Sequence, residues 1–395
     1  MSSSRRVLAV CHDAGGARAL MPVAEELVRR GASVEACVAG PAASIWPREC
    51  SSVKSQEVAD DLGESEARAR LQRQGVDTLF SASGLYNQVE HTFRVAARAL
   101  AARTVAVLDS WLNYAERFER CSNGRVVRSH PDLVCVIDEL SYQGMLAAGF
   151  SPEQLVVTGP PNLEASVRLC SAVDAAQRAA WRAEDGLTAE GLVVTFFSEP
   201  FVTGPNGQHF EGPGALIGHD GGSLFGYTAL DTLDAVLHEL EAACREARRP
   251  CTVIVRPHPA ECADPLRSLL AARRTRWVDA VVRGDRNASR WIAVADVVVG
   301  MMTIALLEAA LAGRPTLSVQ LGLREARAED PCLGNRLGYT YPIYDRAELG
   351  LAMRRACRDA MEPRPGLPGR ELPIWGAVER VASAVLDSAL ATRVG

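Results

Sequence analysis

The chain has 395 residues, of which 48% are hydrophobic and 23% are charged, and its formal net charge is -5. This composition excludes a mainly disordered chain and supplies enough apolar residues for two hydrophobic cores. An acidic balance without a basic block argues against a general nucleic-acid binder or a membrane-surface binder. We therefore expect a globular protein of two or three domains, with two the better estimate for an α/β chain.

The basic residues are almost all arginine, because Lys54 is the sole lysine among 43. Codon usage in a GC-rich genome accounts for this bias, but the chemical consequence holds in any case. No G-x-x-x-x-G-K-[ST] loop is present, and a Schiff-base enzyme would have to use Lys54. Phosphates or carboxylates must therefore be recognised by arginine, histidine, hydroxyl or backbone N–H groups.

Cysteine usage and hydropathy indicate the cellular compartment in which the protein is expected. The eleven cysteines include no C-x-x-C pair and fall mostly on apolar segments, which favours reduced, buried thiols over disulfides or a zinc site. The first residues lead directly into an apolar run, without the pattern of a signal peptide, and no apolar run is long enough to cross a bilayer. We expect a cytoplasmic protein without stable membrane insertion. Oligomeric state cannot be predicted from these features.

Short apolar runs alternate with helical patterns in the first half of the chain. This alternation predicts a parallel sheet covered by helices on both faces. The expected strands are 7–10, 33–38, 77–80, 104–108, 133–137 and 155–157, and the clearest helices are 17–30 and 85–102.

The segment Thr158-Gly159-Pro160-Pro161-Asn162 interrupts this pattern, and the alternation then begins again. We expect an N-terminal domain over 1–165, a linker over 166–190, a second α/β domain over 191–372, and a last helix within 373–395. The second domain has predicted strands 192–197, 251–255, 280–282, 297–299 and 316–319, and predicted helices 228–248, 290–294 and 303–313. The Gly- and Pro-rich stretch 199–225 is either a functional loop or disordered.

Ligands of doubly wound domains bind at the carboxyl ends of the strands, so the residues after each strand are the candidates. His12 and Asp13 follow the first strand and form a candidate acid–base pair, while Gly15 and Gly16 would let a ligand approach the next helix. The alternative is a plain turn in which Asp13 caps the helix. Asp109 and Asn113 follow the expected strand 104–108 as candidate acceptor contacts, with helix capping and core packing of Trp111 as the alternative.

Two further segments of the second domain are candidates for phosphate recognition. Arg256 and His258 lie in an Arg-Pro-His-Pro turn that follows a strand, where the prolines fix their positions. The second segment is a buried strand ending at Gly300, followed by a helix start at Met302 and Thr303. That helix start offers N–H groups and a hydroxyl to a diphosphate, and Glu308 could accept hydrogen bonds from a ribose.

These two segments resemble the donor-binding half of GT-B glycosyltransferases and their relatives: UDP-N-acetylglucosamine 2-epimerases, CDP-glycerol glycerophosphotransferases and capsule Kdo transferases. The segment 157–162 is similar to the interdomain hinge of the epimerases. The resemblance implies two Rossmann-like, doubly wound domains facing a cleft. The C-terminal domain would hold the nucleotide donor, and the N-terminal domain the acceptor. Residues 373–395 would pack back on the N-terminal domain.

The resemblance carries the donor role onto Arg256, His258, Met302, Thr303 and Glu308, and the base role onto His12 or Asp13. The expected function is a metal-independent glycosyltransferase that needs no cofactor and uses a nucleotide-activated sugar as substrate. Alternatives are a nucleotide-sugar 2-epimerase or hydrolase, a CDP-glycerol-type glycerophosphotransferase, or a non-catalytic binding subunit of the same fold. The nucleotide, the transferred group, the acceptor and the stereochemical outcome are open.

Overall fold

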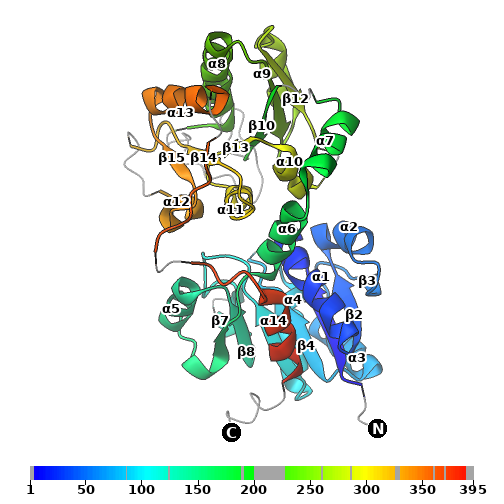
Figure 1. Cartoon of the computed structure of the whole chain (residues 1–395). Coiled ribbons are helices and arrows are strands. Elements are labelled where there is room, and N and C mark those ends of the chain that lie inside the picture. The colour runs from blue at the N-terminus through cyan, green and yellow to red at the C-terminus, as the bar shows by residue number, and fades with distance from the viewer. Residues whose placement is uncertain are drawn as a thin grey trace. The chain divides into compact units, whose positions relative to one another are not determined.

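The computed structural model describes most of the chain in detail. The described residues are 4–85, 87–122, 125–187, 191–199, 227–258, 261–284, 287–324, 330–358, 361–368 and 371–387. The chain forms two compact units: unit 1 comprises Met1–Ala165 and Leu372–Gly395, and unit 2 comprises Ser166–Glu371 (Figure 1).

Unit 1 is built on a parallel sheet with the strand order β3-β2-β1-β4-β5-β8-β9. β1 lies in the interior of the sheet, and five of its six residues are buried, as expected for a strand covered on both faces. The register pairs Val10 with Cys37 on one side and with Ser81 on the other. The strands are β1 (Arg6–Cys11), β2 (Ser33–Val38), β3 (Ser55–Glu57), β4 (Thr78–Ser81), β5 (Arg103–Val107), β8 (Leu133–Val136) and β9 (Leu155–Val157), and a separate antiparallel hairpin joins β6 (Glu119–Ser122) to β7 (Arg125–Arg128).

Helices cover this sheet. They are α1 (Ala14–Arg29), α2 (Gly40–Glu49), α3 (Glu64–Gln74), α4 (Val89–Ala99), α5 (Glu139–Ala147) and α14 (Ala377–Leu386), with a single 3-10 turn at Pro152–Gln154. α14 comes from the other end of the chain, yet it packs beside α1. Val381 and Val385 of α14 are fully buried in the same core cluster as Leu20 and Leu27 of α1. Residues from both ends of the chain therefore complete one core.

Unit 2 repeats the architecture with the strand order β12-β11-β10-β13-β14-β15, all parallel. Its strands are β10 (Leu192–Phe197), β11 (Cys251–Arg256), β12 (Val278–Val282), β13 (Val297–Gly300), β14 (Thr316–Val319) and β15 (Tyr341–Ile343). Its helices are α7 (Ala175–Glu184), α8 (Ala229–Ala247), α9 (Asp264–Ala272), α10 (Ala288–Val294), α11 (Ile304–Leu311), α12 (Leu333–Leu337) and α13 (Arg346–Arg358), while α6 (Pro161–Ser171) contains the boundary between the units.

Several boundaries differ from those expected. The stretch 166–190 was expected to be a linker, but it belongs to unit 2 and contains most of α6 and all of α7. α4 begins at Val89 rather than at 85, and α14 begins at Ala377 because Gly376 has a φ of 79°. Of the Gly- and Pro-rich stretch 199–225, Glu199 alone lies within the described residues. No described helix combines the length and apolar character needed to cross a bilayer.

Candidate active site

The carboxyl ends of β1 and β4 and the start of α4 bring acidic side chains together in unit 1. Asp13 is the N-cap residue of α1, but its side chain makes no capping hydrogen bond. Instead, its Oδ1 lies 2.7 Å from Nδ1 of His12. The other ring nitrogen of His12, Nε2, lies 3.4 Å from Oδ1 of Asp60. The simple capping alternative for Asp13 therefore does not hold, and the histidine ring lies between two carboxylates.

Glu90 of α4 is the buried centre of this group and is 1% exposed. Its Oε1 accepts the backbone N–H of His12 at 3.1 Å, and its Oε2 accepts that of Gly84 at 2.6 Å. A methyl group added at Gly84 would lie 2.5 Å from Asp13 Oδ2 and 3.3 Å from Glu90 Oε1. The carboxylates of Asp13 and Glu90 therefore face the same small space.

Asp109, which follows β5, joins the same group. A methyl group added at Gly15 would lie 3.1 Å from its Oδ2, so the start of α1 packs against this carboxylate. Its Oδ1 accepts hydrogen bonds from Arg117 at 2.9 Å and from the Ser83 hydroxyl at 3.4 Å. The structure thus brings together His12, Asp13, Gly15 and Asp109 from two separate segments. We call His12, Asp13, Glu90 and Asp109 the acidic cluster.

Burial and mutual repulsion change the proton affinities within the acidic cluster. Burial raises the pKa of Glu90, which Arg94 opposes, and it raises the pKa of Asp109, which Arg117 opposes. The hydrogen bond that the His12 ring donates to Asp13 raises the pKa of His12 against the opposing effect of burial. Carboxyl groups with raised pKa and a histidine with raised pKa are suited to exchanging protons with a substrate near neutral pH.

Other predicted residues of unit 1 have local structural roles. Gly16 is buried, and a methyl group there would lie 2.6 Å from Cβ of Ala82, so this glycine permits α1 to pack against the end of β4. Asn113 is exposed and adopts a φ of 58°, a conformation that asparagine tolerates. Trp111 is buried and donates its indole N–H to Asp138 Oδ2 at 2.8 Å, in agreement with the alternative of core packing.

In unit 2, Arg256 and His258 line a pocket of about 320 Å³ at the carboxyl ends of β11 and β12. Arg267 of α9 adds a second guanidinium group to the wall of this pocket. The carboxylate of Glu261 fixes the turn, because it accepts the backbone N–H of His258 at 3.0 Å and the Ser198 hydroxyl at 2.8 Å. Burial lowers the pKa of His258, so its ring is neutral at physiological pH. We call this cavity the arginine pocket.

The start of α11 is already occupied by an acidic side chain. Oε2 of Glu199, which follows β10, accepts the backbone N–H of Met302 at 2.8 Å. The Thr303 hydroxyl accepts the N–H of Ala305 at 3.3 Å and so caps its own helix. Farther along α11, Glu308 Oε2 accepts the hydroxyl of Ser166 at 3.0 Å. All three predicted residues of this segment thus have partners within unit 2.

Four residues of these sites were not predicted from the sequence: Glu90, Asp60, Arg117 and Glu199. Glu90 and Arg117 carry no motif, because Glu90 lies in α4 and Arg117 lies in the loop before β6, each several residues after a strand. Asp60 is similarly remote from any recognised pattern. Glu199 is the second residue after β10 and could have been found by applying the strand-end rule to that strand as well.

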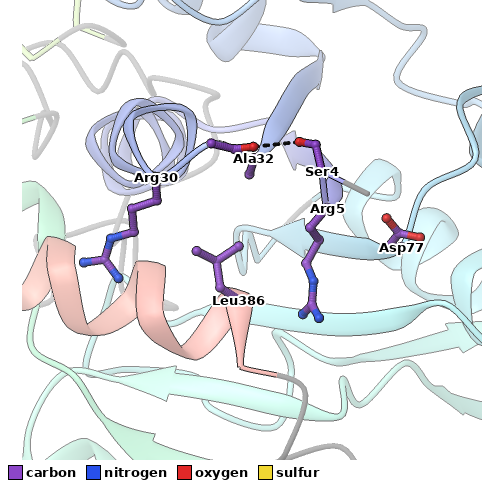
Figure 2. A pocket seen from close by; sticks show the side chains of 7 residues that line it. Ser4, Arg5, Arg30, Ala32, Asp77 and Leu386 are labelled. Atoms are coloured by element: carbon purple, nitrogen blue, oxygen red, sulfur yellow. Dashed lines mark hydrogen bonds between the residues drawn. The ribbon is translucent and has the colours of Figure 1, made fainter. Parts of the chain in front are cut away.

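A second hollow lies away from these groups. It measures about 530 Å³ and is lined by residues that precede β1, β2 and β4, together with Arg30 and Leu386 (Figure 2). Figure 2 shows the side chains of Arg5 and Arg30 on either side of Leu386. Because it adjoins the amino ends of the strands, it is not at the edge where ligands of doubly wound sheets bind.

Comparison with known proteins identifies the fold. No protein-family model matches the sequence, and no curated protein matches it. Among solved structures, the UDP-GlcNAc 2-epimerase of Methanocaldococcus jannaschii is similar with a TM-score of 0.65, 10% identity and coverage of 96% of this chain and 99% of that one. The UDP-GlcNAc 2-epimerase of Neisseria meningitidis bound to UDP-GlcNAc is similar with a TM-score of 0.63 and 11% identity. The match covers 96% of this chain and 99% of that one.

A glycosyltransferase from Rickettsia africae is also similar, with a TM-score of 0.54, 9% identity and coverage of 98% of this chain and 96% of that one. At such low identity, the likeness establishes the fold alone. It spans nearly the whole of each chain, with a parallel sheet in each unit. The chain therefore has the GT-B fold, as its donor-site motifs predicted.

Proposed function

We propose that the protein is an enzyme that acts on a nucleotide-activated sugar and breaks the bond between the sugar and the diphosphate. The acidic cluster carries this proposal, because it places several proton-exchanging groups at the strand ends where GT-B domains act. The fold is shared with epimerases and a glycosyltransferase, which supports this substrate class. Unit 1 would supply the acid–base groups, and unit 2 the nucleotide site at Arg256, His258, Met302, Thr303 and Glu308.

An epimerase-type reaction is the form of this activity that we favour. Inversion at a sugar carbon requires one group to remove a proton from carbon and another to return a proton, and the leaving group also needs stabilisation. The acidic cluster offers more than one carboxyl group with raised pKa for these steps. The two epimerases also give higher TM-scores than the glycosyltransferase does.

Glycosyl transfer to an acceptor hydroxyl is the second candidate. It is supported by the His12–Asp13 pair, because a single base is sufficient to activate a hydroxyl. Asp109 would then contact the acceptor instead of the sugar carbon. In either reaction the arginine pocket would hold the anionic donor without a lysine.

The reaction can be identified with nucleotide sugars in D₂O. We expect the protein, incubated with UDP-GlcNAc without an acceptor, to form an epimer that has gained one deuterium on carbon, as detected by NMR and mass spectrometry. Free UDP and free sugar would indicate hydrolysis, and turnover that requires an added acceptor would indicate transfer. If the protein neither converted nor bound any of the UDP-, GDP-, CDP- and CMP-sugars, the proposal would be contradicted. That result would favour a non-catalytic subunit.

A pair of variants connects the activity to the acidic cluster. Asp109→Asn removes a proton-exchanging carboxyl group and is expected to lower kcat about 100-fold or more. The matched control is Asp77→Asn, at the opposite end of the same sheet, which should retain wild-type kcat. Equal activity of both variants would exclude Asp109 from the chemistry.

A further inference from the structure

Glu199 places a buried carboxyl group at the very position that the proposed function assigns to a phosphate. Its side chain is 7% exposed, and its carboxylate accepts the N–H of Met302 at the start of α11. The backbone N–H groups of Met301 and Thr303 also act on this carboxylate. These are the groups that a helix start offers to a bound anion. A diphosphate and the Glu199 carboxylate cannot use them at the same time.

The surroundings of Glu199 act on the ionisation of its carboxyl group in opposite directions. The N–H groups of the helix start favour the ionised carboxylate, whereas burial disfavours it, and burial is the larger effect. The nearby carboxylate of Glu261 acts in the same direction as burial. No guanidinium or ammonium group pairs with Glu199 among the ion pairs of the described residues.

We propose that Glu199 determines nucleotide affinity by occupying the phosphate position at the start of α11, and that it must leave this position when a nucleotide binds. This inference rests on the proposed function and deepens it, because it assigns a role to a residue outside the predicted donor set. Glu199 then acts as an internal competitor of the diphosphate. Removing its carboxylate should strengthen nucleotide binding rather than weaken it.

The titration of Glu199 lets this displacement be measured as a pH dependence of nucleotide affinity. Burial raises the pKa of Glu199 to about 8, so the carboxyl group is mostly protonated at pH 7. A carboxyl group displaced into water recovers its ordinary pKa, near 4.5, and releases its proton. Nucleotide affinity should therefore rise with pH through the region of pH 8. If Glu199 instead stayed in place beside the phosphate, affinity would fall with pH because two anions would repel each other.

Of the other groups around Glu199, Tyr227, Cys332 and His258 do not titrate between pH 7 and pH 9. Burial also raises the pKa of Glu261, and the Glu261→Gln variant separates its titration from that of Glu199. The titratable groups that interact with it are Glu261, Tyr227 and Cys332. Burial raises the pKa of Tyr227 above this range and that of Cys332 to about 11, so both remain neutral. Burial lowers the pKa of His258, whose backbone N–H contacts Glu261, so its ring also stays neutral in this range. The diphosphate diester of a nucleotide sugar does not titrate in this range.

Calorimetric titration with UDP-GlcNAc tests the proposal. For the wild type, we expect affinity to rise about tenfold from pH 7 to pH 9, with release of about one proton per ligand at pH 7 in buffers of different ionisation enthalpy. Glu199→Gln should bind with an affinity that is independent of pH, and Glu199→Ala should bind more tightly than wild type at pH 7. Glu261→Gln is the control, because it retains Glu199 and so should retain the rise, at a slightly lower pH.

The possible failures are distinguishable. A wild-type affinity that is flat or falls with pH would overturn the displacement of Glu199, even if nucleotide binding and turnover were intact. Weaker binding by Glu199→Ala, in a protein whose circular dichroism and Tm match wild type, would also overturn it. If neither wild type nor any variant bound a nucleotide sugar, the proposed function itself would fail. Because proton release is measured on the wild type, the test does not depend on the variants folding.

Discussion

Gly15 and Gly16 are neighbours at the start of α1, but the structure gives them different reasons to be glycine. A methyl group at position 15 would meet the flexible carboxylate of Asp109 at 3.1 Å, whereas one at position 16 would meet Cβ of Ala82 at 2.6 Å. Both glycines had been interpreted as openings for a ligand. For Gly16, the close packing of α1 on the end of β4 is a sufficient explanation.

Gly16→Ala should therefore destabilise unit 1, since the main chain of α1 or of the β4 end must shift to make room. We expect a loss of about 1–3 kcal/mol in the free energy of unfolding, as for other overpacked sites. Urea denaturation measures it, with Gly15→Ala as the matched control. That variant gains helix propensity and needs only a side-chain adjustment, so it should stay within about 1 kcal/mol of wild type. Equal stability of the two variants would refute the packing argument.

His12 is the residue whose ionisation the local structure controls most directly. Its partner Asp13 raises its pKa above the ordinary 6.5, so protonation favours the folded state. The resulting stabilisation is full below pH 6.5 and disappears as pH rises through the higher pKa of the folded protein. At neutral pH a larger fraction of the ring is therefore protonated than at the ordinary pKa, which makes a proton available for donation.

NMR titration of the His12 ring should show this dependence on Asp13. Asp13→Asn is expected to lower the pKa of His12, because it removes the main cause of the increase. Asp60→Asn should lower it less, since the Asp60 carboxylate is farther away and 67% exposed. A His12 pKa that is unchanged by Asp13→Asn would show that the 2.7 Å contact does not govern its protonation.

Among the elements, α14 has its first N–H groups capped by a buried carboxylate from another helix. Glu164 of α6 is fully buried and accepts the backbone N–H of Gly376 at 2.7 Å and that of Val378 at 2.8 Å. These are N–H groups at the start of α14 that no residue of the helix itself can satisfy. Because Gly376 has no side chain to cap the helix, Glu164 performs that role from a distant part of the sequence.

Glu164→Ala should loosen α14, because it leaves two N–H groups without their acceptor in a buried setting. We expect a loss of about 2 kcal/mol in the free energy of unfolding, together with faster hydrogen exchange of the α14 amides. Glu66→Ala is the control, since it removes an exposed carboxylate whose partner is Arg70, four residues along the same helix. Its effect should stay within about 0.5 kcal/mol. Similar losses for both variants would mean that the Glu164 contact does not hold α14.

At the scale of the whole molecule, the sequence predicted the alternation of strands and helices well, because both sheets are parallel and buried. Strands β2, β9, β10 and β14 have the expected bounds. The short strand β3 was not predicted, because its residues Ser55–Glu57 lack an apolar signal, and the β6–β7 hairpin was not predicted either. Such elements are determined by pairing with neighbours rather than by local composition.

The candidate site was predictable in part for a related physical reason. His12, Asp13 and Asp109 directly follow strands, so the topology alone brings them to one edge. Glu90 and Arg117 reach the same place from a helix and a loop, and only three-dimensional packing shows that. Whether Thr303 is available to a ligand could not be inferred from its position, because the side chain in front of it comes from the end of another strand, β10.

The contribution of α14 to unit 1 has a consequence for biosynthesis. Ribosomes deliver a chain in one direction, so residues 1–165 emerge long before Val381 and Val385, which are fully buried in their core. Unit 2, whose residues are continuous in sequence, can complete its folding while the nascent chain is still attached. The segment made first therefore keeps the apolar surface that α14 covers exposed until residues 377–386 have been synthesised.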